Sequence, residues 1–139
     1  MTFEFSPPIG RTATAYPALL VNAARCWRGA RDDRQPIQPL LVSLLSRQGC
    51  AILAPVLDSL MHCYETALGR PLAVGADGEL TDDERLLVAL VSGSARRAAC
   101  LDCPKEAALT LDCALCSARI MLALEQMMAP PEAASLTLQ

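Results

Sequence analysis

The chain has 139 residues, of which 53% are hydrophobic and 4% are aromatic, and its formal net charge is −3. This length fits one domain whose core is large enough to fold without disulfides. The net charge disfavours binding to nucleic acid, because a clear basic excess supplies most of the affinity for a phosphate backbone.

Three features predict a cytoplasmic protein without a membrane segment. No unbroken run of about 20 apolar residues is long enough to span a bilayer. The N-terminal segment has neither the basic region nor the apolar region of a signal peptide. The seven cysteines are an odd number, and thiols in a reducing compartment are packed, metal-bound or reactive rather than paired.

The N-terminal segment is predicted to be extended, because Pro7, Pro8 and Gly10 lie in a stretch without apolar periodicity. Pro17 then suits the first position of a helix, where its missing N–H is not needed. The predicted division of the chain is an extended N-terminal arm over 1–16, a single helical domain over 17–129 and a flexible C-terminal tail over 130–139.

Apolar residues recur at intervals of three and four along the first half of this domain, which is the spacing of one helix face. Pro55 falls in the first turns of the third such helix, and Gly69 is expected to end it. The helices are predicted over about 17–30, 36–48 and 50–68. Their predicted inner-face residues are Leu19, Leu20, Ala23, Trp27 and Ala30, then Ile37, Leu41, Leu44 and Leu45, then Leu53, Val56, Leu57, Leu60, Tyr64 and Leu68.

The next segment, 70–80, is predicted to be a loop with at most one short hairpin at Asp77-Gly78. Thr81 and Glu84 have the spacing of a capping box, in which each side chain bonds the other residue's backbone N–H. A helix is therefore expected from this point, with Leu86, Leu87, Leu90 and Val91 buried. The glycine-containing segment 92–94 either ends that helix or lets another helix approach closely.

The last helix is predicted to begin near Pro104 and to continue to Met127. Two apolar stripes run along it side by side, so it is expected to be buried over more than half of its circumference. The first stripe is Leu109, Cys113, Cys116, Ile120, Leu124 and Met127. The second stripe is Leu111, Leu115, Ala118 and Leu122.

Two CxxC pairs, Cys100 with Cys103 and Cys113 with Cys116, are the sequence feature closest to a known chemical site. Four thiolates of this kind suit a tetrahedral zinc ion, which is the alternative interpretation. A continuous last helix would however place Cys103 and Cys113 about 15 Å apart along its axis, too far for one ion. We therefore expect no cofactor and no shared metal.

The favoured interpretation takes the cysteines as small apolar residues of the core, which is how free cysteine usually behaves. Cys113 and Cys116 lie in the first stripe of the last helix, and Cys26, Cys50 and Cys63 also follow apolar patterns. A third interpretation is redox chemistry at Cys103, with Cys100 in support, because a helix N-terminus favours the thiolate.

Two other groups of polar residues are candidates for function. Asp58, His62 and Glu65 share one helix face, where they form either a proton-transfer site or, more simply, a solvated ridge. A row of arginines repeats every third residue, and it either contacts an anion or an acidic partner or is a solvated helix end. These arginines are Arg25, Arg28, Arg31 and Arg34.

The sequence thus predicts an all-α fold, a compact bundle of five or six helices. None of the common nucleotide-binding, metalloprotease or hydrolase motifs is present, so catalysis is not expected. Wide apolar stripes on several helices exceed what a small bundle can bury, and such surfaces usually mark interfaces. We expect a non-enzymatic interaction or regulatory module that pairs with itself as a homodimer or with another protein, and with neither nucleic acid nor membrane.

Overall fold

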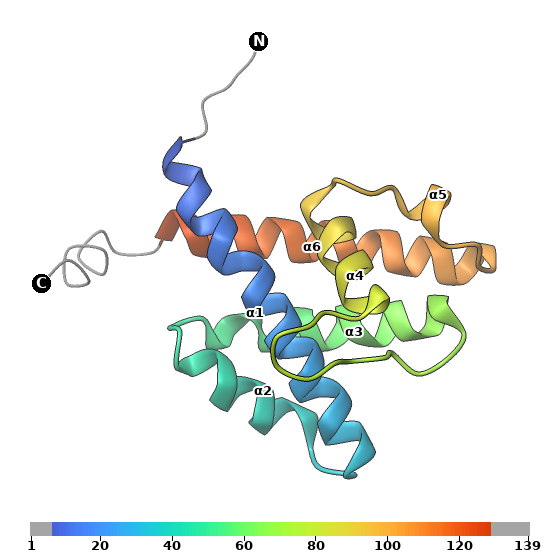
Figure 1. The fold of residues 1–139 in the computed structure, drawn as a ribbon, viewed down its shortest axis with the longest axis horizontal. Coiled ribbons are helices and arrows are strands. Elements are labelled where there is room, and N and C mark those ends of the chain that lie inside the picture. The colour runs from blue at the N-terminus through green and yellow to red at the C-terminus, as the bar shows by residue number, and fades with distance from the viewer. Residues whose placement is uncertain (1–6, 129–139) are drawn as a thin grey trace, which may run out of the picture.

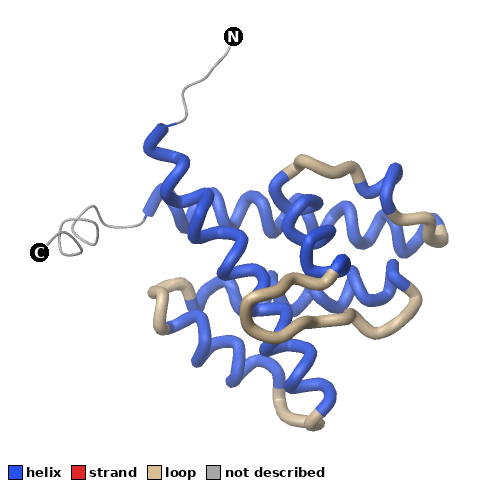
Figure 2. The backbone as a smooth tube through the Cα atoms, in the orientation of Figure 1, coloured by secondary structure: helices blue, strands red, loops and turns tan. Residues whose placement is uncertain are grey.

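The computed structural model describes residues 7–128, with side chains described from Pro17 onward, and this part of the chain contains helices and loops but no strand (Figures 1 and 2). The predicted all-α class is confirmed, and the segment at Asp77 and Gly78 forms a turn without a hairpin. The elements are α1 (Pro7–Asp32), α2 (Ile37–Ser46), a 3-10 turn η1 (Ala51–Leu53), α3 (Ala54–Leu68), α4 (Asp82–Ser92), α5 (Arg97–Cys100) and α6 (Lys105–Met128).

The N-terminal prediction is wrong from Pro7 onward, because the backbone is helical there and not extended. Pro7 and Pro8 occupy the first turn of α1, where a missing N–H leaves no helical hydrogen bond unmade. Pro17 lies inside α1 rather than at its start. The first turns of α1 extend beyond the other helices in Figure 1. Residues 1–6 and the predicted tail, 130–139, lie outside the described residues.

The core forms where α3 packs against α6 and where α1 crosses both α3 and α4. Figure 1 shows α3 and α6 running in opposite directions, with α1 across them. Trp27 from α1 and Tyr64 from α3 are the largest fully buried side chains. The Trp27 Nε1 donates to Asp58 Oδ1 at 2.8 Å, and the Tyr64 hydroxyl donates to the Asp83 carbonyl at 2.7 Å. The polar tips of both rings are therefore satisfied inside the core.

Among the predicted elements, α3 and α4 match most closely. Gly69 adopts a left-handed conformation with φ of 73° and ends α3, as its sequence position indicated. The capping box is present at the start of α4, where Thr81 Oγ1 accepts from the Glu84 N–H at 3.0 Å. Gly93, with φ of 88°, ends α4, so the first of the two alternatives for segment 92–94 is correct.

The buried acids at the start of α4 hold the loop 69–81, which crosses the front of the molecule in Figure 2. Asp83 accepts two hydrogen bonds from Arg70 and one from the Ala73 N–H. Glu84 accepts two from Arg25, at 2.8 and 3.1 Å, and one each from the N–H groups of Gly75 and Thr81. These two carboxylates therefore accept the hydrogen bonds of loop N–H groups that a neighbouring strand would otherwise have to satisfy.

Both acids have a lowered pKa. Hydrogen bonding from Arg70 lowers the pKa of Asp83 more than burial raises it. Burial alone would raise the pKa of Glu84, but hydrogen bonds from Arg25 and from the backbone outweigh it and lower that pKa. Both groups are therefore ionised acceptors in the folded protein near neutral pH.

Candidate interaction surface

One side of α6 forms an exposed apolar surface, here named the α6 face. Its large side chains are between 45% and 79% exposed, and its two cysteines are also exposed. The residues of the α6 face are Leu109, Cys113, Cys116, Ile120, Leu124 and Met127. They are the first of the two stripes that the sequence predicted to be buried, so that part of the prediction is wrong.

The opposite side of α6 holds the helix in the core. Ala108 and the second predicted stripe, Leu111, Leu115, Ala118 and Leu122, are all buried, so that stripe is confirmed as core. Because α3, α4 and α5 leave one side of this helix uncovered, and α6 is apolar almost all round, a second apolar stripe stays exposed. The face extends about 27 Å from Leu109 to Met127, at 1.5 Å per residue.

Two charged residues that flank the α6 face between Leu109 and Met127, Asp112 and Arg119, are engaged within the chain, whereas the exposed Lys105 and Glu106 precede the face in the first turn of α6. Asp112 accepts from Arg97 Nε at 2.6 Å, and Arg119 donates to the carbonyl groups of Leu90 and Val91. Glu125 is half-buried on the α3 side. A partner that covered the face between Leu109 and Met127 would therefore not have to desolvate Asp112 or Arg119 as unpaired charges, which is the main penalty at apolar interfaces.

The length and composition of α6 would also allow it to cross a bilayer. The sequence contains no unbroken apolar run of that length because Asp112, Arg119 and Glu125 interrupt it. In the most apolar stretch of 18 residues in α6, 28% of the residues are buried, and these residues pack against α3 and α4. Core helices of soluble proteins also reach this length and apolarity, so these two properties do not identify a membrane span.

The two CxxC pairs do not behave as the favoured interpretation proposed. Cys113 and Cys116 are exposed on the α6 face rather than packed in the core, and Cys100 at the end of α5 is exposed as well. Cys103 is half-buried, as are Cys26 and Cys63, whereas Cys50 is buried. Within residues 7–128 no three histidine, cysteine or acidic side chains gather in a way that could hold a metal ion. All seven cysteines are free thiols.

We expect a zinc chelator to leave the melting temperature of the parent protein unchanged. The reason is that α6 is continuous from Lys105, so about 12 Å of helix lies between its start and Cys113, and Cys103 precedes that start by two residues. Thermal unfolding with and without the chelator, together with elemental analysis, measures this. One zinc per chain, and collapse of the parent on chelation, would show instead that the ion contributes folding energy.

The arginine row on α1 is not a free anion site. Arg25 is paired with the buried Glu84, and Arg28 is paired with Asp32 and Glu65. Arg31 lies 3.7 Å from Glu65 and stacks on the Trp27 ring, with 4.9 Å between its guanidinium carbon and the ring centroid. Glu84 belongs to α4 and Glu65 to α3, so the row joins α1 to both helices, whereas Asp32 lies on α1 itself. Arg34 is exposed and has a positive φ of 56°.

The three residues of the predicted ridge, Asp58, His62 and Glu65, differ in their surroundings: the two acids bond other segments and the histidine is exposed. Asp58 accepts hydrogen bonds from Trp27 and from Gln38 Nε2, the latter at 2.8 Å. Glu65 accepts from Arg28 and from the Leu72 N–H. His62 is exposed, and its ring lies edge-on to Trp27. Both acids are engaged in structural hydrogen bonds, so the arrangement does not have the form of a proton relay.

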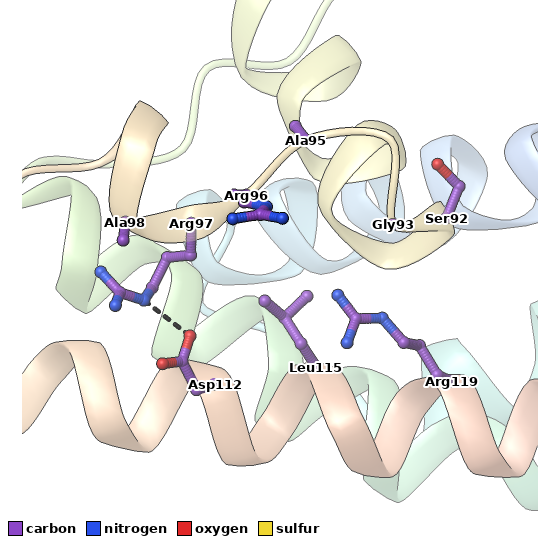
Figure 3. A pocket seen from close by; sticks show the side chains of 9 residues that line it. All are labelled: Ser92, Gly93, Ala95, Arg96, Arg97, Ala98, Asp112, Leu115 and Arg119. Atoms are coloured by element: carbon purple, nitrogen blue, oxygen red, sulfur yellow. Dashed lines mark hydrogen bonds and ion pairs between the residues drawn. The ribbon is translucent and has the colours of Figure 1, made fainter.

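A hollow lined by three arginines lies on the α4 and α5 side of α6, and we name it the arginine pocket. Its volume is about 540 Å³, and Arg96, Arg97 and Arg119 line it around Leu115, with Asp112 as its one acid (Figure 3). Sequence reasoning missed this site. The adjacent pair Arg96-Arg97 and the isolated Arg119 in an apolar helix were visible, but their proximity depends on the turn at Gly93.

The fold and the surface together define an all-helical protein with an exposed, uncharged helix face and a basic hollow beside it. Comparison with models of known families, with characterised proteins and with solved structures found no match to this chain.

Proposed function

We propose that this protein is a non-enzymatic interaction module that pairs with a second copy of itself through the α6 face. The observation that carries the proposal is the composition of that face, which is exposed and about 27 Å long and has no charged residue among its six members. A solvated helix normally presents charged side chains to water, and a contiguous apolar patch of this extent usually marks an interface.

The order of side-chain sizes along the face favours self-pairing. Small Cys113 and Cys116 occupy the first half, and the larger Ile120 and Leu124 occupy the second half. In an antiparallel pair of α6 helices, Ile120 and Leu124 face Cys116 and Cys113 of the other copy, which permits close packing at the centre. Leu109 and Met127 then meet at the two ends. A parallel pair would place small residues opposite small ones and leave gaps. The resulting dimer has two-fold symmetry, which is the commonest symmetry of oligomers.

The expected affinity is modest. The large side chains of the face are already partly covered, so burying the remainder contributes on the order of 1 kcal/mol each. For two copies this is comparable with the loss of translational and rotational freedom on association, about 4–15 kcal/mol. We therefore expect a dimer that dissociates on dilution.

We expect Ile120→Asp to convert this dimer into a monomer without lowering the stability of the monomer. The carboxylate would stand at the centre of the interface without a partner, whereas in the monomer it would lie in water, because Ile120 is 55% exposed. Sedimentation equilibrium over a range of concentrations measures the association. Circular dichroism checks that the helical content is unchanged.

Val42→Asp is the matched control, because Val42 on α2 is also an exposed apolar residue, at 39%, but lies away from α6. This variant should remain dimeric. A parent protein that sediments as a monomer at the highest concentration would contradict self-pairing, and equal effects of the two substitutions would contradict the assignment to α6.

We also propose a reducing compartment such as the cytoplasm for this module. Two cysteines lie at the centre of the α6 face and are free thiols. Oxidation would make them polar or would cross-link copies at random, so the proposed interface requires that they stay reduced.

A further inference from the structure

We propose that the arginine pocket binds a phosphoryl group of a small soluble ligand. The proposal is independent of self-pairing, because the pocket lies between α6 and the segment from α4 to α5, outside the α6 face. Figure 3 shows the guanidinium groups of Arg96 and Arg119 above and beside Leu115, with Arg97 directed toward Asp112.

Arg119 is held in place in a way that leaves its binding edge free. Its Nε donates to the Val91 carbonyl at 3.1 Å and its Nη2 to the Leu90 carbonyl at 2.6 Å. These bonds satisfy carbonyl groups in the last turn of α4. They use one edge of a planar group with five N–H donors, so the edge formed by Nη1 and Nη2 can still bind an anion bidentately.

The arginine pocket has more basic than acidic side chains in its lining, whereas the ion-paired arginines elsewhere each lie beside an acid. Five arginines elsewhere in the described chain are paired with acids, whereas the exposed Arg34 and Arg47 form no ion pair among residues 17–128. The paired ones are Arg25, Arg28, Arg31, Arg70 and Arg85. In the pocket Asp112 pairs with Arg97, while Arg119 is held by neutral carbonyl groups. Arg96 is exposed and takes part in none of the ion pairs among residues 17–128. Three arginines and one acid leave a formal charge of about +2 on the lining.

This arrangement favours a phosphoryl group over a carboxylate. A phosphate monoester carries close to two negative charges near neutral pH, which matches the lining, and its three terminal oxygens can accept from two arginine forks at once. A carboxylate has one charge and two oxygens. The hollow of about 540 Å³ lies in the range of small-molecule sites, and the buried Leu115 supplies an apolar floor for the rest of a ligand.

The test is calorimetric titration of the full chain with inorganic phosphate and with pyrophosphate, at constant ionic strength. We expect saturable binding of pyrophosphate by the parent, weakened at least about tenfold in Arg96→Gln. Arg96 is exposed, so this variant should fold normally. Arg47→Gln is the control, because it removes an equal charge from an exposed position next to α2, and it should bind as the parent does.

A second variant, Arg119→Lys, keeps the charge but loses the fork, and we expect it also to weaken binding. Absence of saturable binding by the parent, or equal binding by Arg96→Gln and Arg47→Gln, would overturn the proposal. Acetate binding as tightly as phosphate would overturn the choice of phosphoryl chemistry. Binding to phosphatidic acid vesicles without binding to pyrophosphate would overturn the choice of a soluble ligand. Dimerisation measured on the same samples reports separately on the α6 face.

Discussion

A Glu84→Ala variant is expected to lose about 3–5 kcal/mol of unfolding free energy. Glu84 is fully buried and accepts hydrogen bonds from Arg25 and from the N–H groups of Gly75 and Thr81. Its removal would leave those donors without an acceptor, break the capping box and release the loop 69–81 from α4. Urea unfolding followed by circular dichroism measures the loss.

Asp82→Ala is the control for this experiment. Asp82 lies in the same first turn of α4 but is exposed, so its removal should change stability far less. Equal losses in the two variants would show that charge near the helix N-terminus, rather than the buried network, stabilises the loop.

The same network makes stability depend on acid pH. The pKa values of Asp83 and Glu84 are lowered in the folded protein, so the unfolded chain binds more protons as the pH falls. Their contribution is therefore fully present above the usual carboxyl pKa of about 4 and is lost as the pH falls through the lowered values. As the pH falls through this range, the unfolding free energy of Glu84→Ala should therefore decrease less than that of the parent. A parent as stable at about pH 3 as at neutral pH would contradict this role.

The second large effect is expected on α6, where Leu111→Ala should cost about 2–5 kcal/mol. Leu111 is fully buried between α6 and the rest of the core, so truncation would leave a cavity. Leu109→Ala is the matched control, because Leu109 lies two residues away on the same helix but is 57% exposed. Its unfolding free energy should fall by no more than about 0.5 kcal/mol when measured at a concentration where the protein is monomeric.

This pair of variants tests which side of α6 faces the core. If Leu109→Ala is the more destabilising substitution, the helix is rotated relative to the structure and the α6 face is buried. Cys113→Ala extends the comparison, since an exposed Cys113 should tolerate alanine with little change in unfolding free energy. A large loss for Cys113→Ala would restore the interpretation in which the cysteines pack in the core.

The sequence by itself determined the positions of several helices and their ends. Local chemistry at Thr81 and Glu84 specifies the start of α4, because the capping box forms within four residues and needs no distant partner. Gly69 ends α3 for a similarly local reason, since glycine adopts a left-handed conformation without steric penalty. The buried face of α3 was also predictable, because its apolar residues lie on one side and its polar residues on the other.

The tertiary structure alone decided which side of α6 became buried and which charges became paired. Two apolar stripes of similar quality run along α6, and neither can be preferred without knowing where α3 and α4 pack. Likewise, Arg25 and Glu84 are 59 residues apart in sequence. Periodicity reports interactions within one turn or two, whereas ion pairs and buried faces between helices depend on how the helices are arranged in space.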